Sequence, residues 1–124
     1  MSYYYLNNLK DALANFSDAV KLNPNNSQYR FYLGKTLFKL KEFEKAIKEL
    51  ETALALKDSN DEVVRFLAES YFTIQEWNKA LKMYQILSEK FPNEFEIHFN
   101  LGQLYFTQDI NDLNKARKHF DIAL

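Results

Sequence analysis

Residues 27–60 read SQYRFYLGKTLFKLKEFEKAIKELETALALKDSN, and this stretch contains the pattern that decides the fold. Its apolar residues recur every three or four positions in two segments of about fourteen residues, which is the spacing of an amphipathic helix. A short polar turn, Lys41-Glu42, separates the two segments. The stretch is therefore predicted to form a hairpin of two antiparallel helices, at 27–40 and 43–56.

The hairpin pattern recurs along the chain with a period of 34 residues. Gly34 and Gly102 are 68 residues apart, as are Pro24 and Pro92, and 68 is twice the period. A fixed period of this kind indicates an array of stacked structural repeats. Stacking the chain at this period aligns one aromatic or leucine position (Tyr3, Leu37, Tyr71, Tyr105) and one alanine position (Ala12, Ala46, Ala80). Ala116 joins the alanine position when a two-residue insertion is allowed before it.

The register divides the whole chain into one array. A partial repeat at 1–26 precedes repeats at 27–60 and 61–94, and an incomplete repeat at 95–124 carries a two-residue insertion within 108–112. Besides the first hairpin, a partial helix is predicted near 2–7. Further helices are predicted at 9–22, 61–74, 77–90, 95–107 and 113–124.

The aligned positions resemble the tetratricopeptide repeat over essentially the whole chain. They are Ala12, Phe16, Ala19 and Pro24; Leu33, Gly34, Leu37, Ala46, Leu50 and Ala53; Leu67, Ala68, Tyr71, Trp77, Ala80, Tyr84 and Pro92; and Leu101, Gly102, Tyr105, Ala116, Phe120 and Ala123. The resemblance implies an all-α fold, a right-handed α–α superhelix of antiparallel hairpins whose first helices line a concave groove. It also implies a role as a scaffold or receptor for peptides or helices of other proteins.

The small residues of the register have a packing reason. Two helices whose axes approach to about 8–10 Å cannot both carry a bulky side chain where they cross. Gly34, Ala68 and Gly102 share one position on the first helices and face the alanine position of the second helices. The two helices of each hairpin are therefore expected to cross at these residues.

If the first helices line a groove, the second, fifth, ninth, twelfth and thirteenth positions of each repeat are expected to face it. The predicted partner-binding residues are Phe31, Lys35, Phe38, Lys39, Arg65, Glu69, Phe72, Phe99, Gln103 and Phe106. Three of these phenylalanines share the twelfth position, and for them packing between neighbouring first helices is a competing interpretation. The clamp that holds the terminal carboxylate of chaperone tails in some family members is absent, because Phe31 and Lys35 occupy its first lysine and asparagine positions.

Composition and charge exclude several kinds of site. The chain of 124 residues has no cysteine, which removes disulfides and thiolate metal sites. His98 and His119 are isolated and are expected to be packed or solvated, and no glycine-rich phosphate loop is present. No catalytic residue, metal site or cofactor is therefore predicted, and the protein is not expected to be an enzyme.

Three functions remain, in order of preference. The first is an interaction module that binds a peptide or helix of a partner protein in the groove. The second is a structural subunit of a larger assembly, with contacts through the array ends and the convex face. The third is an RNA-binding helical array. It is disfavoured because the chain has sixteen basic and seventeen acidic residues and therefore no excess of positive charge.

The ends of the chain suggest further contacts. The last residues, Ile122-Ala123-Leu124, are apolar, whereas arrays usually end in a helix with a polar outer face. Flanking repeats or a second copy are therefore expected to cover the array ends. Neither a signal peptide nor an apolar run of about 18 residues is found, so a cytoplasmic protein without a membrane span is expected.

Overall fold

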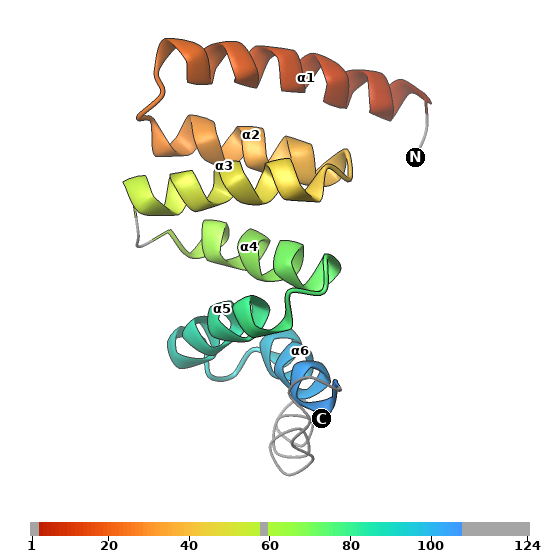
Figure 1. The fold of residues 1–124 in the computed structure, drawn as a ribbon, viewed down its shortest axis with the longest axis vertical. Coiled ribbons are helices and arrows are strands. Elements are labelled where there is room, and N and C mark those ends of the chain that lie inside the picture. The colour runs from red at the N-terminus through yellow and green to blue at the C-terminus, as the bar shows by residue number, and fades with distance from the viewer. Residues whose placement is uncertain (1–2, 58–59, 108–124) are drawn as a thin grey trace. The chain divides into compact units, whose positions relative to one another are not determined.

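The computed structural model describes residues 3–57 and 60–107 of the chain, which form α-helices and no strand within these ranges (Figure 1). The helices are α1 (Tyr3–Leu22), α2 (Ser27–Lys39), α3 (Phe43–Leu56), α4 (Asp61–Thr73), α5 (Trp77–Lys90) and α6 (Phe95–Phe106). They belong to two compact units, of which the first extends to Ser70 and the second begins at Tyr71.

The predicted all-α class is confirmed, and α2 to α6 begin at the predicted residues and end within one residue of the predicted ends. The helix predicted at 113–124 and the insertion predicted within 108–112 lie outside the described residues.

The first helix differs from the prediction. The expected break between 7 and 9 is wrong, because α1 is one continuous helix of 20 residues. In the later hairpins the corresponding turn residues, Lys41 and Gln75, adopt the left-handed conformation with φ of 64° and 66°. That conformation costs a non-glycine residue roughly 1–2 kcal/mol. In a complete hairpin, packing of the helix before the turn against the helix after it offsets this cost. Within the described residues no separate helix precedes α1 in this way, whereas continuing the helix adds a hydrogen bond per residue.

The turn between α2 and α3 has a defined hydrogen-bonding pattern. The Glu42 N–H donates to the carbonyl of Leu37 at 2.9 Å, and the Lys41 N–H donates to the carbonyl of Phe38 at 2.9 Å. These two bonds around a left-handed residue are the Schellman motif that ends many helices. The turn at 74–76 repeats both bonds, so the two hairpin turns have the same construction.

Lys41→Gly is expected to raise the free energy of unfolding by about 0.5–1 kcal/mol, because glycine adopts the left-handed conformation without steric cost but also gains freedom in the unfolded chain. Urea denaturation followed by circular dichroism measures this change. The matched control is Lys39→Gly in the last turn of α2, which is expected to lower stability by a similar amount. Equal signs for the two variants would contradict the assigned turn.

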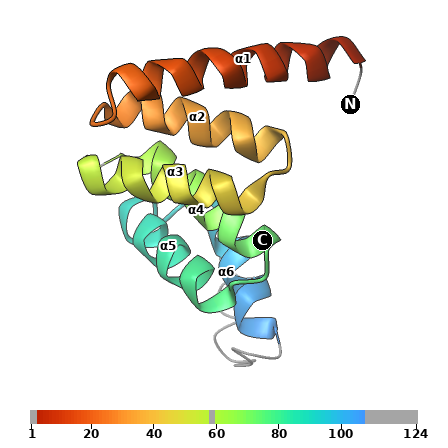
Figure 2. The same ribbon diagram turned by 45° about the horizontal axis from the view of Figure 1, so that its top comes forward.

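The helices α2 and α3 approach closely at Gly34. A Cβ atom on this residue would lie 2.8 Å from Cγ of Leu50 and 3.3 Å from the carbonyl oxygen of Ala46. The packing reason predicted for Gly34 is therefore confirmed, since a larger residue would collide with α3. Figure 2 shows α1, α2 and α3 following one another side by side in the first unit, and their shared core contains Val20, Leu33, Leu37 and Ala46.

Asparagine side chains mark the starts of two first helices. Asn26 Oδ1 accepts a hydrogen bond from the N–H of Tyr29 at 3.0 Å. Asn60, which lies one period later, accepts bonds from the N–H groups of Glu62 at 3.1 Å and Val63 at 3.4 Å. Such caps satisfy N–H groups that lack a partner within the helix. Helix starts are thus specified locally at the same position of consecutive repeats.

In the second unit α5 packs against α6. Leu87, Leu101 and Leu104 are buried, and Gln85 Nε2 donates to the hydroxyl of Tyr105 at 3.0 Å. His98 is also buried, and its Nε2 donates to the carbonyl of Pro92 at 2.6 Å. The prediction of a packed structural histidine is therefore confirmed for His98.

Candidate protein-interaction surface

The predicted groove residues lie on α2 and α4 in the first unit and on α4 and α6 in the second. We call the surface that they form within each unit the first-helix face of that unit. In the first unit its centre is an aromatic cluster. The ring centroid of Phe66 lies 5.7 Å from those of both Phe31 and Phe38, with interplanar angles of 68° and 85°. Edge-to-face contacts of this kind are favourable. We call these three residues the phenylalanine cluster.

The members of the cluster differ in exposure. Phe31 is only 4% exposed and supports the surface from below, whereas Phe38 is half-buried. The contact of Phe38 with Phe66 joins α2 to α4 and is the kind of packing that the competing interpretation of Phe38 predicts. Phe66 itself is missing from the predicted set. The sixth position holds Tyr32 and Asn100 in the neighbouring repeats, so an aromatic residue recurs there in only two of the three repeats.

Two lysines give the α2 part of the face a positive charge. Lys35 Nζ lies 5.9 Å and 5.6 Å from the ring centroids of Phe31 and Phe66, within the range of cation–π contacts. Lys39 is exposed one turn later. The helix contains no acidic residue, and its third cation, Arg30, pairs with Glu49 of α3 at 2.8 Å. Lys35 and Lys39 make no ion pair with any residue that the structure describes, so their positive charge remains on the first-helix face of the first unit.

Arg65 and Glu69 are the predicted residues of α4 in the first unit. Arg65 is half-buried and Glu69 is exposed, and each already makes an interaction within the chain. Their charges are opposite, so they add no net charge to the face. The positive charge of the predicted residues in the first unit therefore comes from Lys35 and Lys39.

In the second unit Phe72 has a packing role. It is half-buried, and its ring meets the ring of Trp77 edge-on, with centroids 5.3 Å apart and an interplanar angle of 75°. The contact joins the end of α4 to the start of α5 across the hairpin turn. Phe72 is therefore less available to a partner than the aromatic residues of α6.

Three phenylalanines of α6 form an exposed stripe. Phe95, Phe99 and Phe106 are 54%, 41% and 63% exposed, and at about 100° per residue they lie within roughly 40° of one another around the helix. The rings of Phe95 and Phe99 stack with centroids 5.9 Å apart. We call these three residues the α6 stripe. Gln103, the remaining predicted residue, is half-buried beside it.

Phe95 was not predicted as part of the site. Its spacing of four residues from Phe99 was visible in the sequence and places both rings on one side of a helix. The aligned positions of the other repeats hold Ser27 and Asp61, so Phe95 does not stand out in the alignment as an aromatic position.

Other kinds of site receive no support from the part of the chain that the structure describes. No group of three or more His, Cys, Asp or Glu side chains is arranged there to hold a metal ion. In residues 3–57 and 60–107, no helix is both long and apolar enough to cross a membrane. The site that the described residues support is therefore a surface of aromatic rings and charges.

Solved structures of similar fold include MamA from Desulfovibrio magneticus RS-1, which is 23% identical with a TM-score of 0.82 over 97% of this chain and 67% of that one. A further crystal structure of MamA is 23% identical with a TM-score of 0.84 over 98% of this chain and 70% of that one. YrrB, described as a TPR protein with an unusual peptide-binding site, is 21% identical with a TM-score of 0.85 over 97% of this chain and 61% of that one. At these identities the likeness concerns the fold, and it confirms the predicted tetratricopeptide-type helical solenoid.

Sequence comparison gives the family directly. No curated protein sequence matches significantly. The family model described as tetratricopeptide repeat matches residues 1–61 and 67–124, which include the hairpin turns, the crossing glycines and most of the register derived above. The chain therefore belongs to the tetratricopeptide repeat family.

Proposed function

We propose that this protein is an interaction module in which the first-helix face of each unit binds a peptide or helical segment of another protein. Membership of the tetratricopeptide repeat family supports the general role of a protein-interaction module. The observation that carries the site is the α6 stripe, in which three large aromatic rings remain 41–63% exposed. Large exposed apolar side chains that gather on one side of a helix are typical of interaction sites.

The aromatic rings alone support only weak binding. Covering one large apolar side chain completely contributes roughly 1.5–3 kcal/mol. Association itself costs an estimated 4–15 kcal/mol. Useful affinity therefore requires polar contacts as well. At the first-helix face of the first unit, Lys35 and Lys39 make no ion pair with a described residue, so their charges favour acidic residues in the bound segment.

The experiment is a selection of random peptides displayed on phage, with the full chain as bait. We expect enrichment of segments that combine a large apolar residue with aspartate or glutamate. The double variant Lys35→Glu/Lys39→Glu is expected to weaken binding of a selected synthetic peptide at least about tenfold, which corresponds to ~1.4 kcal/mol. Isothermal titration calorimetry measures the affinity.

Matched variants separate charge, aromatic contact and folding. Phe99→Ala is expected to cost more than about 1 kcal/mol of binding free energy while leaving the helical circular dichroism unchanged. Lys82→Glu reverses the charge of one exposed lysine on α5, away from the first-helix face, and is expected to leave the peptide affinity unchanged. Selected peptides that bind all four proteins equally would refute binding at the first-helix face.

A structural role in a larger assembly is the second candidate. Leu22 and Leu56 occupy the same position of consecutive repeats, at the C-terminal ends of α1 and α3, and are 81% and 40% exposed. Permanent subunit contacts would explain exposed leucines at helix ends. Stable co-purifying subunits that dissociate on Leu22→Ser/Leu56→Ser but tolerate Lys35→Glu/Lys39→Glu would favour this function.

A further inference from the structure

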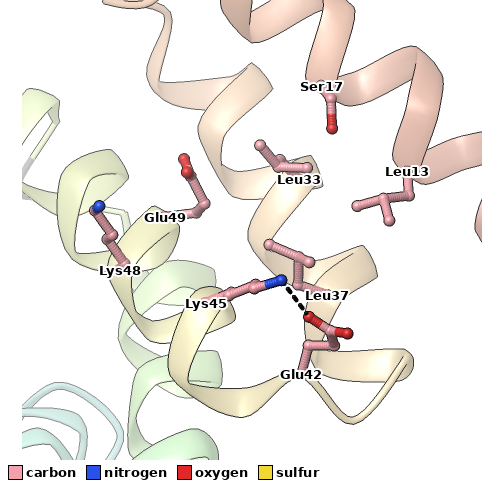
Figure 3. A pocket seen from close by; sticks show the side chains of 8 residues that line it. All are labelled: Leu13, Ser17, Leu33, Leu37, Glu42, Lys45, Lys48 and Glu49. Carbon is pink, nitrogen blue, oxygen red and sulfur yellow. Dashed lines mark ion pairs between the residues drawn. The ribbon is translucent and has the colours of Figure 1, made fainter.

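A cavity of about 420 Å³ lies in the first unit between α1, α2 and α3 (Figure 3). Its apolar wall consists of Leu13 of α1 and of Leu33 and Leu37 of α2. At about 100° per residue, Leu33 and Leu37 lie on the side of α2 roughly opposite to Phe31 and Lys35. The cavity is therefore separate from the first-helix face.

Two residues that line the cavity differ from their counterparts in the second unit. Ser17 and Leu37 lie 68 residues before Gln85 and Tyr105 and occupy the same repeat positions. In the second unit Gln85 Nε2 donates to the hydroxyl of Tyr105 at 3.0 Å, which bridges α5 and α6. Serine is too short for this bridge and leucine has no hydroxyl group. The side-chain bridge between α5 and α6 therefore has no counterpart between α1 and α2 among the described residues.

The hydroxyl group of Ser17 is available to a ligand. The hydroxyls of Thr36, Thr52 and Ser70 each donate to the carbonyl oxygen four residues earlier in their helix. Ser17 makes no such bond to any described residue, and Figure 3 shows its oxygen directed from α1 into the space between the helices. A hydroxyl in this position can donate to a carbonyl or carboxylate oxygen.

The α3 side of the cavity is lined by two acidic residues, Glu42 and Glu49, and two basic residues, Lys45 and Lys48. Glu42 pairs with Lys45 at 3.1 Å, and Glu49 pairs with Arg30 at 2.8 Å. Lys48 also lines the cavity, is exposed, and makes no ion pair within residues 3–57 and 60–107. Because each acidic group already has a cation, the charge of Lys48 is uncompensated.

The form of the opening favours a macromolecular ligand. Small-molecule sites usually bury roughly 70–90% of their ligand. Here the side chains of Lys45 and Glu42 at the opening are 75% and 47% exposed, so the recess cannot enclose a small ligand to that extent. A segment of another protein brings its own surface to close the opening.

We propose that this cavity is a second binding site, which takes an acidic amphipathic segment of a partner protein. One or two leucine-sized side chains of the segment enter between α1 and α3 against Leu13, Leu33 and Leu37. An aspartate or glutamate of the segment faces Lys48, and Ser17 donates to a different carbonyl or carboxylate oxygen of the segment. The site acts independently of the first-helix face, so the chain can hold two protein segments at once.

The test is an NMR titration of the ¹⁵N-labelled full chain with an acetylated peptide of repeated Glu-Leu-Leu-Ala units. The amide signals of Ser17, Leu33 and Lys48 are expected to shift. The double variant Ser17→Gln/Leu37→Tyr introduces the residue pair that forms the Gln85–Tyr105 bridge in the second unit. Its larger side chains are expected to occupy the cavity and to weaken binding at least about tenfold. Ser17→Gln alone, which keeps the buried leucine, is expected to weaken it about threefold or more.

Charge variants complete the test. Lys48→Glu is expected to weaken binding about threefold to tenfold, and a peptide of Lys-Leu-Leu-Ala units is expected to bind more weakly than the glutamate peptide. Lys82→Glu is expected to change nothing. Unchanged affinity of the folded Ser17→Gln variants, or equal affinity for the two peptides, overturns the proposal. Loss of binding on Lys35→Glu/Lys39→Glu alone would assign the peptide to the first-helix face and also overturns it.

Discussion

Leu50→Ala is expected to lower the free energy of unfolding by about 2–5 kcal/mol. Leu50 is 0% exposed and lies against Gly34 where α2 and α3 cross. Truncation removes apolar contacts and leaves a cavity between two helices that cannot approach each other further. Urea denaturation followed by circular dichroism measures the loss.

A double-mutant cycle tests whether the Leu50 side chain is the cause of the glycine requirement. Gly34→Ala alone is expected to cost about 1–3 kcal/mol, because its Cβ collides with Leu50. In the Leu50→Ala background the same Cβ enters the space that the leucine side chain vacates. The double variant is therefore expected to be more stable than the sum of the single losses, by about 0.5–3 kcal/mol. Additive losses would contradict the proposed collision.

Leu104→Ala is expected to destabilise the second unit by about 2–5 kcal/mol, because Leu104 is 0% exposed within α6. In a repeat array each repeat interacts mainly with its neighbours, so the effect is expected to be local. Hydrogen exchange of the backbone amides is expected to accelerate in α5 and α6 much more than in α1 to α3.

Phe106→Ala is the matched control for Leu104→Ala on the same helix. Phe106 is largely exposed, so its truncation is expected to change stability by no more than about 0.5 kcal/mol. Equal acceleration of exchange in all helices of the Leu104→Ala variant would show that the array unfolds as one unit. That outcome would refute the local effect.

The hairpins could be predicted because their signals are local and repeated. The apolar spacing, the short polar turns and the shared position of Gly34 and Gly102 all recur at one period. A misleading residue in one repeat is therefore outweighed by the corresponding residues of the other repeats. The continuous α1 could not be predicted in this way. At the position that corresponds to Lys41, the chain of α1 stays helical at Asn7. Whether a left-handed residue is compensated there depends on tertiary contacts.

The candidate site was only partly visible in the sequence. Helical spacing placed Lys35 and Phe99 on one face of their helices, but it could not show that Phe31 is buried beneath Lys35 or that Phe95 is exposed. Phe66 was missed because its partners come from another helix. The cavity at Ser17 was missed because a short side chain has no signal until its neighbours are known.

The sequence by itself determined the repeat, the two-helix hairpin and the side of each helix that faces its neighbours. With 3.6 residues per turn, the separation of two residues in the sequence fixes the angle between their side chains around the helix axis. The tertiary structure alone decided which of those side chains are covered. Phe38 and Phe106 share one repeat position, yet Phe38 packs against Phe66 while Phe106 is largely exposed. Burial is set by the atoms that a neighbouring helix brings into contact, and direction along a single helix does not contain that information.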